Sequence, residues 1–182
     1  IIACPLPENT VHIYKELKRR QMPYALSYRN DERIYPSEVL KDILLGAAYV
    51  FMNKCEALQI RKEYDLENIE ELLGYPNSQI QVIVVTMGTA GSDIYFRKKD
   101  GAIKKESVPI CRSTKSCADT IGAGDAFMAG FLMGCLKNKS YVECAKWGHV
   151  MSSFVIEKVG SITNLPTLTE LIQREKRGYD FS

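Results

Sequence analysis

The sequence predicts an α/β fold organised around a mainly parallel β-sheet. Short apolar runs of strand length alternate with segments of helical periodicity through the first 90 residues, which is the pattern of βαβ units. Residues 47–52 form a continuous apolar run and residues 80–86 are rich in β-branched side chains, as strands inside a parallel sheet are. At 182 residues the chain is long enough for a hydrophobic core of its own. We therefore expect a single α/β domain over residues 1–182, with right-handed crossovers.

Capping and breaking residues set the bounds of the first elements. Asn9 or Thr10 can cap a first helix, Pro36 fits the first turn of a second one, and Gly46 can end it. The elements expected before residue 90 are, in order, a strand entered midway at 1–5, a helix at 9–21, a strand at 23–28, a helix at 36–45, a strand at 47–52, helices at 54–64 and 66–73, and a strand at 80–86.

The second half of the chain predicts a β-hairpin followed by helices. Strands are expected at 92–97 and 102–108, joined by the turn signal Lys98-Lys99-Asp100-Gly101. The unbroken apolar run from Ala126 to Leu136 predicts a helix buried on most sides. Two more helices are expected at 141–157 and 168–176, followed by a frayed tail.

Composition and charge limit the functional classes. The formal net charge is +2, which gives no strong attraction to nucleic acid or to a membrane. The longest uncharged run, 126–136, is too short to span a bilayer. Six scattered cysteines without a Cys-x-x-Cys pair, and only two histidines, argue against a zinc site. Several cysteines lie in apolar stretches, so we expect a reducing, cytoplasmic setting, with disulfides as the alternative.

The clearest chemical signal is the stretch from Asp119 to Leu132. Gly122, Ala123 and Gly124 let the backbone approach a ligand, and the helix that follows offers unpaired amides and its dipole to a phosphate. Asp125 then stands at the edge of this anion site. It is either a general base for a hydroxyl that attacks a phosphoryl group, or a first-turn acid that stabilises the helix dipole by about 0.3–1 kcal/mol. The residue types alone leave both open.

The segment Asp119-Thr120-Ile121-Gly122-Ala123-Gly124-Asp125-Ala126-Phe127 resembles the C-terminal signature of the ribokinase-like family, the phosphofructokinase B type sugar and nucleoside kinases. The resemblance implies a three-layer αβα fold with a mainly parallel sheet. It implies that Asp125 is the catalytic base and that the amides of Gly122, Ala123 and Gly124 form the anion hole. Asp119 and Thr120 are expected at the nucleotide, with Asp119 orienting the loop through backbone N–H groups. ATP would be the donor, and potassium could bind near this loop.

Asn53 and Glu56 follow the end of the predicted strand at 47–52. In open α/β sheets ligands bind at that edge, and Mg²⁺ prefers oxygen ligands and keeps several waters. An amide and a carboxylate three residues apart are also a helix capping box. Asn-x-x-Glu is similar to the metal and phosphate motif of the family. The resemblance therefore favours Asn53 and Glu56 as residues that hold a Mg²⁺–phosphate unit through water.

Two further segments are similar to nucleotide-binding segments of the family. Thr86-Met87-Gly88-Thr89-Ala90-Gly91 follows the strongest predicted strand, so Thr86 and Gly88 are expected to contact nucleotide and Gly91 to form a turn. The helix over 145–160 is expected beside the adenine, ending in a turn at Gly160-Ser161. His149 takes a place where the family often has asparagine, with a core histidine as the alternative.

The resemblance covers the chain almost throughout and corresponds to the C-terminal portion of a longer kinase, without the N-terminal part and lid. We expect ATP-dependent transfer of the γ-phosphoryl group to a hydroxyl of a sugar or nucleoside, with Mg²⁺ as cofactor. The alternatives are a catalytically inactive fragment that only binds nucleotide, and a structural piece that binds none. A small-molecule substrate is the expected partner, without nucleic acid or membrane, and a homodimer is left open.

Overall fold

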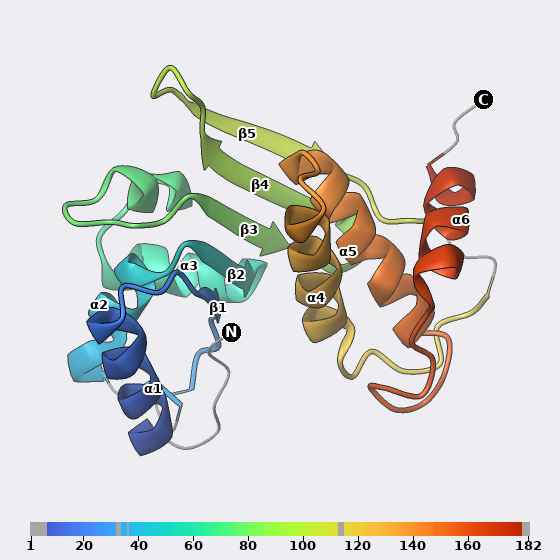
Figure 1. Cartoon of the computed structure of the whole chain (residues 1–182), viewed down its shortest axis with the longest axis horizontal. Coiled ribbons are helices and arrows are strands. Elements are labelled where there is room, and N and C mark those ends of the chain that lie inside the picture. The colour runs from blue at the N-terminus through green and yellow to red at the C-terminus, as the bar shows by residue number, and fades with distance from the viewer. Residues whose placement is uncertain (1–6, 32–33, 36, 113–114, 180–182) are drawn as a thin grey trace. The chain divides into compact units, whose positions relative to one another are not determined.

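The structure is a computed structural model that describes residues 7–31, 34–35, 37–112 and 115–179 (Figure 1). The chain divides into two compact units, which we describe separately. Unit 1 comprises Ile1–Met87 and Asp93–Lys105, and unit 2 comprises Gly88–Ser92 and Glu106–Ser182. The strand expected at 1–5 and the last three residues of the tail lie outside the described residues. One domain over residues 1–182 stays a prediction.

A parallel sheet forms the centre of unit 1. Strands β1 (Ala25–Ser27), β2 (Tyr49–Asn53) and β3 (Val82–Thr86) pair in parallel, with Val50 opposite Leu26 and opposite Ile83. The parallel α/β sheet predicted from the alternating pattern is therefore confirmed. Strands β4 (Ser92–Arg97) and β5 (Ile103–Val108) continue the order to β1-β2-β3-β4-β5.

The predicted hairpin turn between β4 and β5 is also confirmed. The Lys98 amide donates to the Ala102 carbonyl at 2.8 Å, and the Gly101 amide donates to the Lys98 carbonyl at 3.0 Å. Gly101 has a φ of +86°, a left-handed conformation that favours glycine.

Three helices accompany the sheet in unit 1: α1 (Pro7–Arg19), α2 (Ser37–Gly46) and α3 (Lys54–Glu63). Helix α1 begins two residues before the predicted cap. The helix expected at 66–73 is a 3₁₀ helix, η1 (Ile69–Gly74). The Asn68 amide donates to Glu71 at 2.6 Å at its start, and Gly74 ends it six residues later. So short a segment fits the tighter helix.

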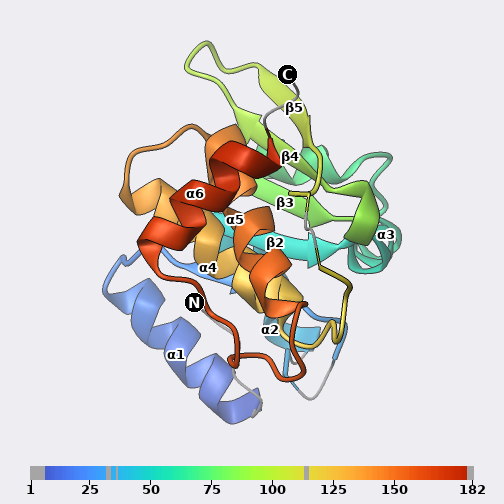
Figure 2. The ribbon, with the colours of Figure 1, turned by 90° about the vertical axis from the view of Figure 1, so that its right-hand side faces the viewer.

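Unit 2 consists mainly of three helices: α4 (Ala123–Leu136), α5 (Tyr141–Val155) and α6 (Leu168–Gly178). Helices α4 and α5 lie side by side, and α6 packs on α5 (Figures 1 and 2). The core of this unit includes Trp147, Val150 and Leu171. Helix α4 begins three residues earlier than the apolar run predicts, because Gly122 caps it in a left-handed conformation.

Glycines set the distance between α4 and α5. A Cβ on Gly130 would lie 2.6 Å from the Trp147 carbonyl oxygen, and one on Gly148 would lie 2.8 Å from the Phe127 carbonyl oxygen. A Cβ on Gly134 would lie 2.9 Å from the Cys144 Cα atom. The two helices therefore touch at backbone distance, which fixes the position of α4 in the unit.

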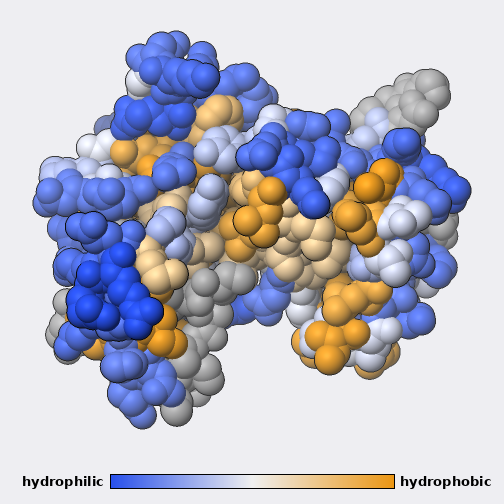
Figure 3. All heavy atoms as spheres, viewed as in Figure 1, coloured by the Kyte–Doolittle hydropathy of each residue, from blue (hydrophilic) through white to orange (hydrophobic). Residues whose placement is uncertain are grey.

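The surface of unit 2 carries apolar side chains on its helices and on the turn after α5. Figure 3 shows hydrophobic residues between hydrophilic ones over the region of α4, α5 and α6. The large exposed hydrophobic residues of this unit are Ile110, Ile121, Met133, Leu136, Val159, Ile162, Leu165, Leu168 and Ile172. In the described part of the chain, no helix combines the length and apolar character that crossing a bilayer requires.

Candidate active site

The predicted site residues of unit 1 gather at the carboxyl edge of the parallel sheet. Asn53 ends β2 and Thr86 ends β3, and the strand register places these two residues opposite each other. The Thr86 hydroxyl donates to the Met52 carbonyl at 3.4 Å. Because the strands are parallel, a ligand at this edge would meet both polar side chains.

Asn53 and Glu56 form a capping box at the start of α3. The Asn53 Oδ1 atom accepts from the Glu56 amide at 2.9 Å, and Glu56 Oε2 accepts from the Asn53 amide at 2.6 Å. The helix-start alternative is thus realised. The box uses one carboxylate oxygen of Glu56, so the other can hold a water.

Glu56 is half-buried, and that burial raises the pKa of its carboxyl, against a lowering by the hydrogen bond from the Asn53 amide. Its donor set with Asn53 and Thr86 contains only oxygen: a carboxylate, an amide carbonyl and a hydroxyl. Hard oxygen donors of this kind fit a hydrated Mg²⁺ ion. The residues present are therefore compatible with the metal that the resemblance implies.

In unit 2 the carboxylate of Asp119 joins two segments of the chain. Its Oδ1 atom accepts from the Ile121 amide at 3.0 Å, and its Oδ2 atom accepts from the Gly160 amide at 3.1 Å. These two backbone hydrogen bonds lower the pKa of Asp119. The backbone hydrogen bonds predicted for Asp119 are therefore present, while its place at the nucleotide stays a prediction.

Gly122 turns the chain into α4. Its φ is +81°, and a Cβ there would lie 2.5 Å from the Cβ of Ser161. Both the backbone conformation and the contact with Ser161 therefore require glycine. The sequence placed Ser161 in the predicted turn after α5, and its contact with Gly122 is a finding of the structure.

Ala123 is already engaged by the protein. Its amide donates to the Thr120 carbonyl at 3.2 Å, and its carbonyl accepts from the Ser152 hydroxyl of α5 at 2.7 Å. The Ala123 amide therefore has an acceptor within the loop, and the anion hole formed by the amides of residues 122–124 stays a prediction. The Ser152 hydroxyl thus holds the start of α4, a role that the sequence did not predict because the two residues are distant along the chain.

The space next to Gly124, in the first turn of α4, is open. A Cβ built there would meet no atom of the described chain within 4 Å, and its backbone is helical. Amides in the first turn of a helix lack an intrahelical acceptor. The open space above Gly124 can therefore admit an anion to the helix N-terminus. Asp125 is exposed in the same first turn, where both of its proposed roles stay open.

The glycine segment after β3 begins unit 2 as a short turn, η2 (Gly88–Ala90). The Gly91 amide donates to the Gly88 carbonyl at 3.1 Å. Gly91 has a φ of +91°, and a side chain there would collide with the Val108 carbonyl. The prediction that Gly91 is a turn residue is confirmed. Gly88 has a φ of +59° and space around its Cα atom.

His149 lies in the core of unit 2. It is 6% exposed, its Nε2 atom is 2.9 Å from the Ser92 hydroxyl, and its ring meets Phe127 edge to face. Burial lowers the pKa of His149 to about 4, against a smaller rise from a hydrogen bond with the Val108 backbone. This is the geometry of the alternative, a satisfied core histidine, so the structure gives His149 no free nitrogen to offer adenine.

The predicted residues thus form two groups, one in each unit. Asn53, Glu56 and Thr86 lie together in unit 1. Unit 2 brings Asp119 and Gly160 into contact with the loop 120–124.

A model of the pfkB family of carbohydrate kinases matches residues 1–168 of the chain. The chain belongs to the pfkB family. This pfkB chain is 33% identical to the nucleoside kinase of Methanocaldococcus jannaschii over 140 residues, which are 77% of this chain and 43% of that protein. It is 27% identical to the cytidine kinase of Thermococcus kodakarensis over 157 residues, 85% of this chain and 53% of that protein.

Solved structures of the family show the same fold. The crystal structure of the M. jannaschii nucleoside kinase matches with a TM-score of 0.78 at 30% identity, over 94% of this chain and 53% of that one. A Burkholderia thailandensis nucleoside kinase, described in complex with ADP-inosine, matches with a TM-score of 0.80 at 23% identity, over 94% and 50%. The predicted ribokinase-like fold is confirmed. This pfkB chain spans about half the length of these relatives.

Proposed function

We propose that this chain acts in ATP-dependent transfer of the γ-phosphoryl group to a hydroxyl of a nucleoside or sugar. The observation that carries the proposal is the N-terminus of α4. Asp119, Ser152 and Ser161 hold the loop that leads into this helix, and the space over Gly124 is open. An anion site of this kind suits a phosphate whose charge grows during transfer.

Asp125 is the proposed base. The acceptor hydroxyl gives its proton to the Asp125 carboxylate while its oxygen forms a bond to the γ-phosphorus. The bond from that phosphorus to the β–γ bridging oxygen breaks, and ADP leaves with the bond's electrons. The amides of residues 122–124 would stabilise the negative charge, with Gly122 and Gly124 contributing most because the Ala123 amide already has an acceptor.

Asn53, Glu56 and Thr86 are proposed to hold the magnesium–nucleotide unit through water. Mg²⁺, when bound, neutralises charge on the phosphate oxygens. The chain's own contribution would be a set of hard oxygen donors at the ends of β2 and β3 and in the first turn of α3, which would orient hydrated Mg²⁺. Gly88 is proposed to lie against the nucleotide. Potassium activation, implied by the family resemblance, would appear as a higher rate in KCl than in NaCl of equal ionic strength.

A nucleoside is the favoured acceptor class. The M. jannaschii and T. kodakarensis relatives are named as nucleoside and cytidine kinases. Sugars stay in the test because the family model is one of carbohydrate kinases. The second candidate function, nucleotide binding without transfer, is supported by one observation: the Ala123 amide, one of the three expected to stabilise the transferred phosphate, already donates to the Thr120 carbonyl.

The deciding experiment is an ADP-release screen over adenosine, cytidine, inosine, ribose, fructose phosphates and inositol, with the Asp125→Asn variant in parallel. We expect the variant to lower turnover by about 10²–10⁴ while ATP affinity changes little. Glu143→Gln is the control, because Glu143 is also a first-turn acid in unit 2. Near-normal turnover of Asp125→Asn would refute the assignment. ATP binding without any phosphorylated product would select the second candidate.

A further inference from the structure

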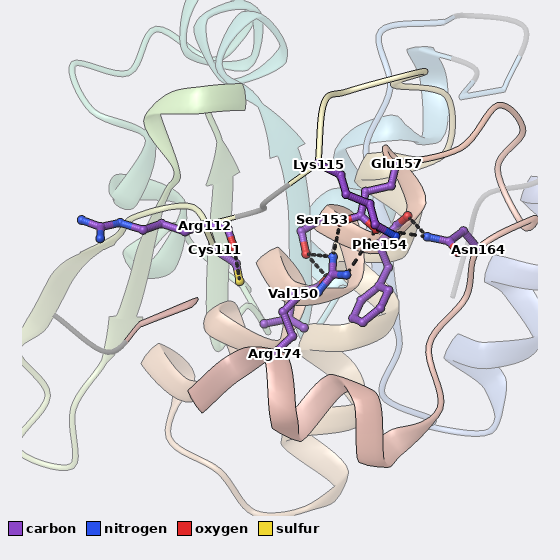
Figure 4. Close-up of polar contacts among 9 residues, drawn as sticks. All are labelled: Cys111, Arg112, Lys115, Val150, Ser153, Phe154, Glu157, Asn164 and Arg174. Atoms are coloured by element: carbon purple, nitrogen blue, oxygen red, sulfur yellow. Dashed lines mark hydrogen bonds and ion pairs between the residues drawn. The ribbon is translucent and has the colours of Figure 1, made fainter. Parts of the chain in front are cut away.

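Unit 2 contains a buried carboxylate that the proposed chemistry does not use. The Glu157 side chain is 1% exposed. Arg174 of α6 grips it with both terminal nitrogens: Nη1 lies 2.7 Å from Oε1 and Nη2 lies 3.2 Å from Oε2 (Figure 4). Asn164 and Lys115 approach Oε2 at 3.5 and 3.6 Å. Two planar groups joined by two hydrogen bonds have a fixed mutual orientation.

The residues on either side of Glu157 hold the loop that leads into α4. The Ile156 carbonyl accepts from the amides of Ala118 and Asp119 at 2.8 and 3.4 Å. The Gly160 amide donates to the Asp119 carboxylate, and Ser161 packs on Gly122. The segment 156–161 is therefore the support on which the loop 118–122 rests. Glu157 lies inside this segment, and its side chain joins the segment to α6.

Arg174 is itself held in one orientation. Its Nη1 atom donates to the Ser153 hydroxyl at 3.1 Å, and its guanidinium carbon lies 3.3 Å from the centre of the Phe154 ring. The Asn164 side chain donates to the Phe154 carbonyl at 2.6 Å and so joins the far end of the segment after α5 to the last turn of that helix. Figure 4 shows these side chains converging between the end of α5 and α6. The guanidinium therefore has little freedom to follow Glu157 if that residue moves.

A buried ion pair is weak evidence for stability, because desolvating both charges offsets much of their attraction. Apolar residues of similar volume often stabilise a fold as well or better. Apolar residues, however, form no directional hydrogen bonds that would fix the position of one segment relative to another. The Glu157–Arg174 pair fixes a position, because a shift of Glu157 would move its neighbours Ile156 and Gly160. The hydrogen bonds of these two residues with the backbone and the carboxylate of Asp119 would then change.

We propose that Glu157 and Arg174 are positioning residues for the anion loop at the N-terminus of α4. Through Ile156, Gly160 and Ser161 they set the place of Asp119 and Gly122, and so the direction in which the first amides of α4 point. The proposal rests on the proposed function in one respect: the anion that these amides receive is the phosphate of ATP.

The test separates positioning from stability with four variants of the chain. Arg174→Met breaks the pair. Arg174→Lys keeps a positive charge without the two-pronged geometry. The double variant Glu157→Leu/Arg174→Met removes both charges and keeps apolar volume. Arg177→Met, an exposed arginine on the same helix, is the matched control. Each is measured for its melting temperature, for hydrogen exchange at the Ile121 and Gly160 amides, and for MgATP affinity.

We expect Arg174→Met to lower protection of the Ile121 and Gly160 amides by about tenfold or more, and Arg174→Lys to do so in part. The double variant should regain the melting temperature of the wild type but not the protection of the two amides. Its affinity for MgATP should stay about tenfold weaker than that of the wild type. Arg177→Met should match the wild type throughout. Recovery of protection together with melting temperature in the double variant would overturn the proposal, because the pair would then act through stability alone.

Failure of the proposed function is distinguishable in the same experiment. If the wild-type chain binds no MgATP, the proposed function fails. The exchange of the two amides, measured without ligand, still decides whether Glu157 and Arg174 position the loop.

Discussion

The Asp119 carboxylate accepts a hydrogen bond from the amide of Gly160, a residue 41 positions further along the chain, at 3.1 Å. Its second oxygen binds the Ile121 amide. One side chain thus joins the loop before α4 to the turn after α5. The loop 119–124 is held in shape by this acid, by Ser152 and by the contact between Ser161 and Gly122.

The Asp119 contacts predict an acid-sensitive loop. Because backbone hydrogen bonds lower the folded-state pKa of Asp119 below the ordinary 3.8, its contribution is fully present above pH 3.8 and is lost as pH falls through the lower folded value. In an NMR titration, the amide resonances of Ile121 and Gly160 should shift together with a midpoint below 3.8. Asp119→Asn should abolish that shared step. A midpoint above 3.8 would contradict the assignment.

Gly122 and Gly124 should respond in opposite ways to alanine. Gly122→Ala should lower the free energy of unfolding by about 1–3 kcal/mol, because it strains a left-handed residue and meets Ser161. Gly124→Ala should leave stability unchanged or raise it by roughly 0.5–1 kcal/mol, since alanine favours the helix. It should nonetheless weaken ATP binding by occupying the open space.

Chemical denaturation and calorimetry with MgATP measure the two effects independently. Unchanged ATP affinity in Gly124→Ala would show that no phosphate approaches that face of the helix. The comparison is internal, because both substitutions add one methyl group to the same loop.

Glu56 is expected to act on Mg²⁺ as well as on its helix. Glu56→Gln should raise the Mg²⁺ concentration needed for half-maximal ATP binding, because an amide replaces the charged ligand of the hydrated ion. Glu71→Gln is the matched control, since Glu71 accepts the Asn68 amide at the start of another helix of unit 1. Equal Mg²⁺ requirements in the two variants would show that Glu56 caps its helix and does not act on Mg²⁺.

His149 predicts a loss of stability between neutral and mildly acidic pH. Its folded-state pKa of about 4 lies below the ordinary 6.5, so the unfolded chain binds the proton more tightly. Stability is fully present above pH 6.5 and falls as pH drops toward 4. From pH 7 to pH 5, the loss from this residue is about 2 kcal/mol.

The other histidine provides the control for that measurement. His12 is exposed on α1, and it is the other of the two histidines in the chain. Urea unfolding at pH 7 and pH 5 should show His12→Gln losing as much stability as the wild type, and His149→Gln losing about 2 kcal/mol less. Equal losses in all three proteins would mean that His149 is protonated without cost in the fold.

Local patterns in the sequence were sufficient for most elements. The β-branched run at 80–86 and the Lys98–Gly101 turn predicted a buried strand and a hairpin, because each signal lies within a few residues. The helix predicted at 66–73 is present as the 3₁₀ helix η1, because helical periodicity over so short a segment does not distinguish a 3₁₀ helix from an α-helix.

The site was predictable where its chemistry is local. The turn at Gly122 and the backbone hydrogen bonds of Asp119 follow from one short motif, while the binding roles assigned to its residues stay predictions. The buried state of His149 was one of the two alternatives that the sequence left open. The hydrogen bond of the Ala123 amide with Thr120 and the pairing of Glu157 with Arg174 were not predicted. A single sequence does not tell which polar groups will meet.

The backbone contact between α4 and α5 has a mechanical consequence for the anion loop. The carbonyl oxygen of Trp147, which faces Gly130, cannot be made smaller by any substitution. A methyl group at Gly130 would therefore push α4 and α5 apart, and a displacement of α4 would move its first residues, Ala123 and Gly124. A substitution two turns along the helix would then change the direction of the backbone amides proposed to bind phosphate, without contacting them.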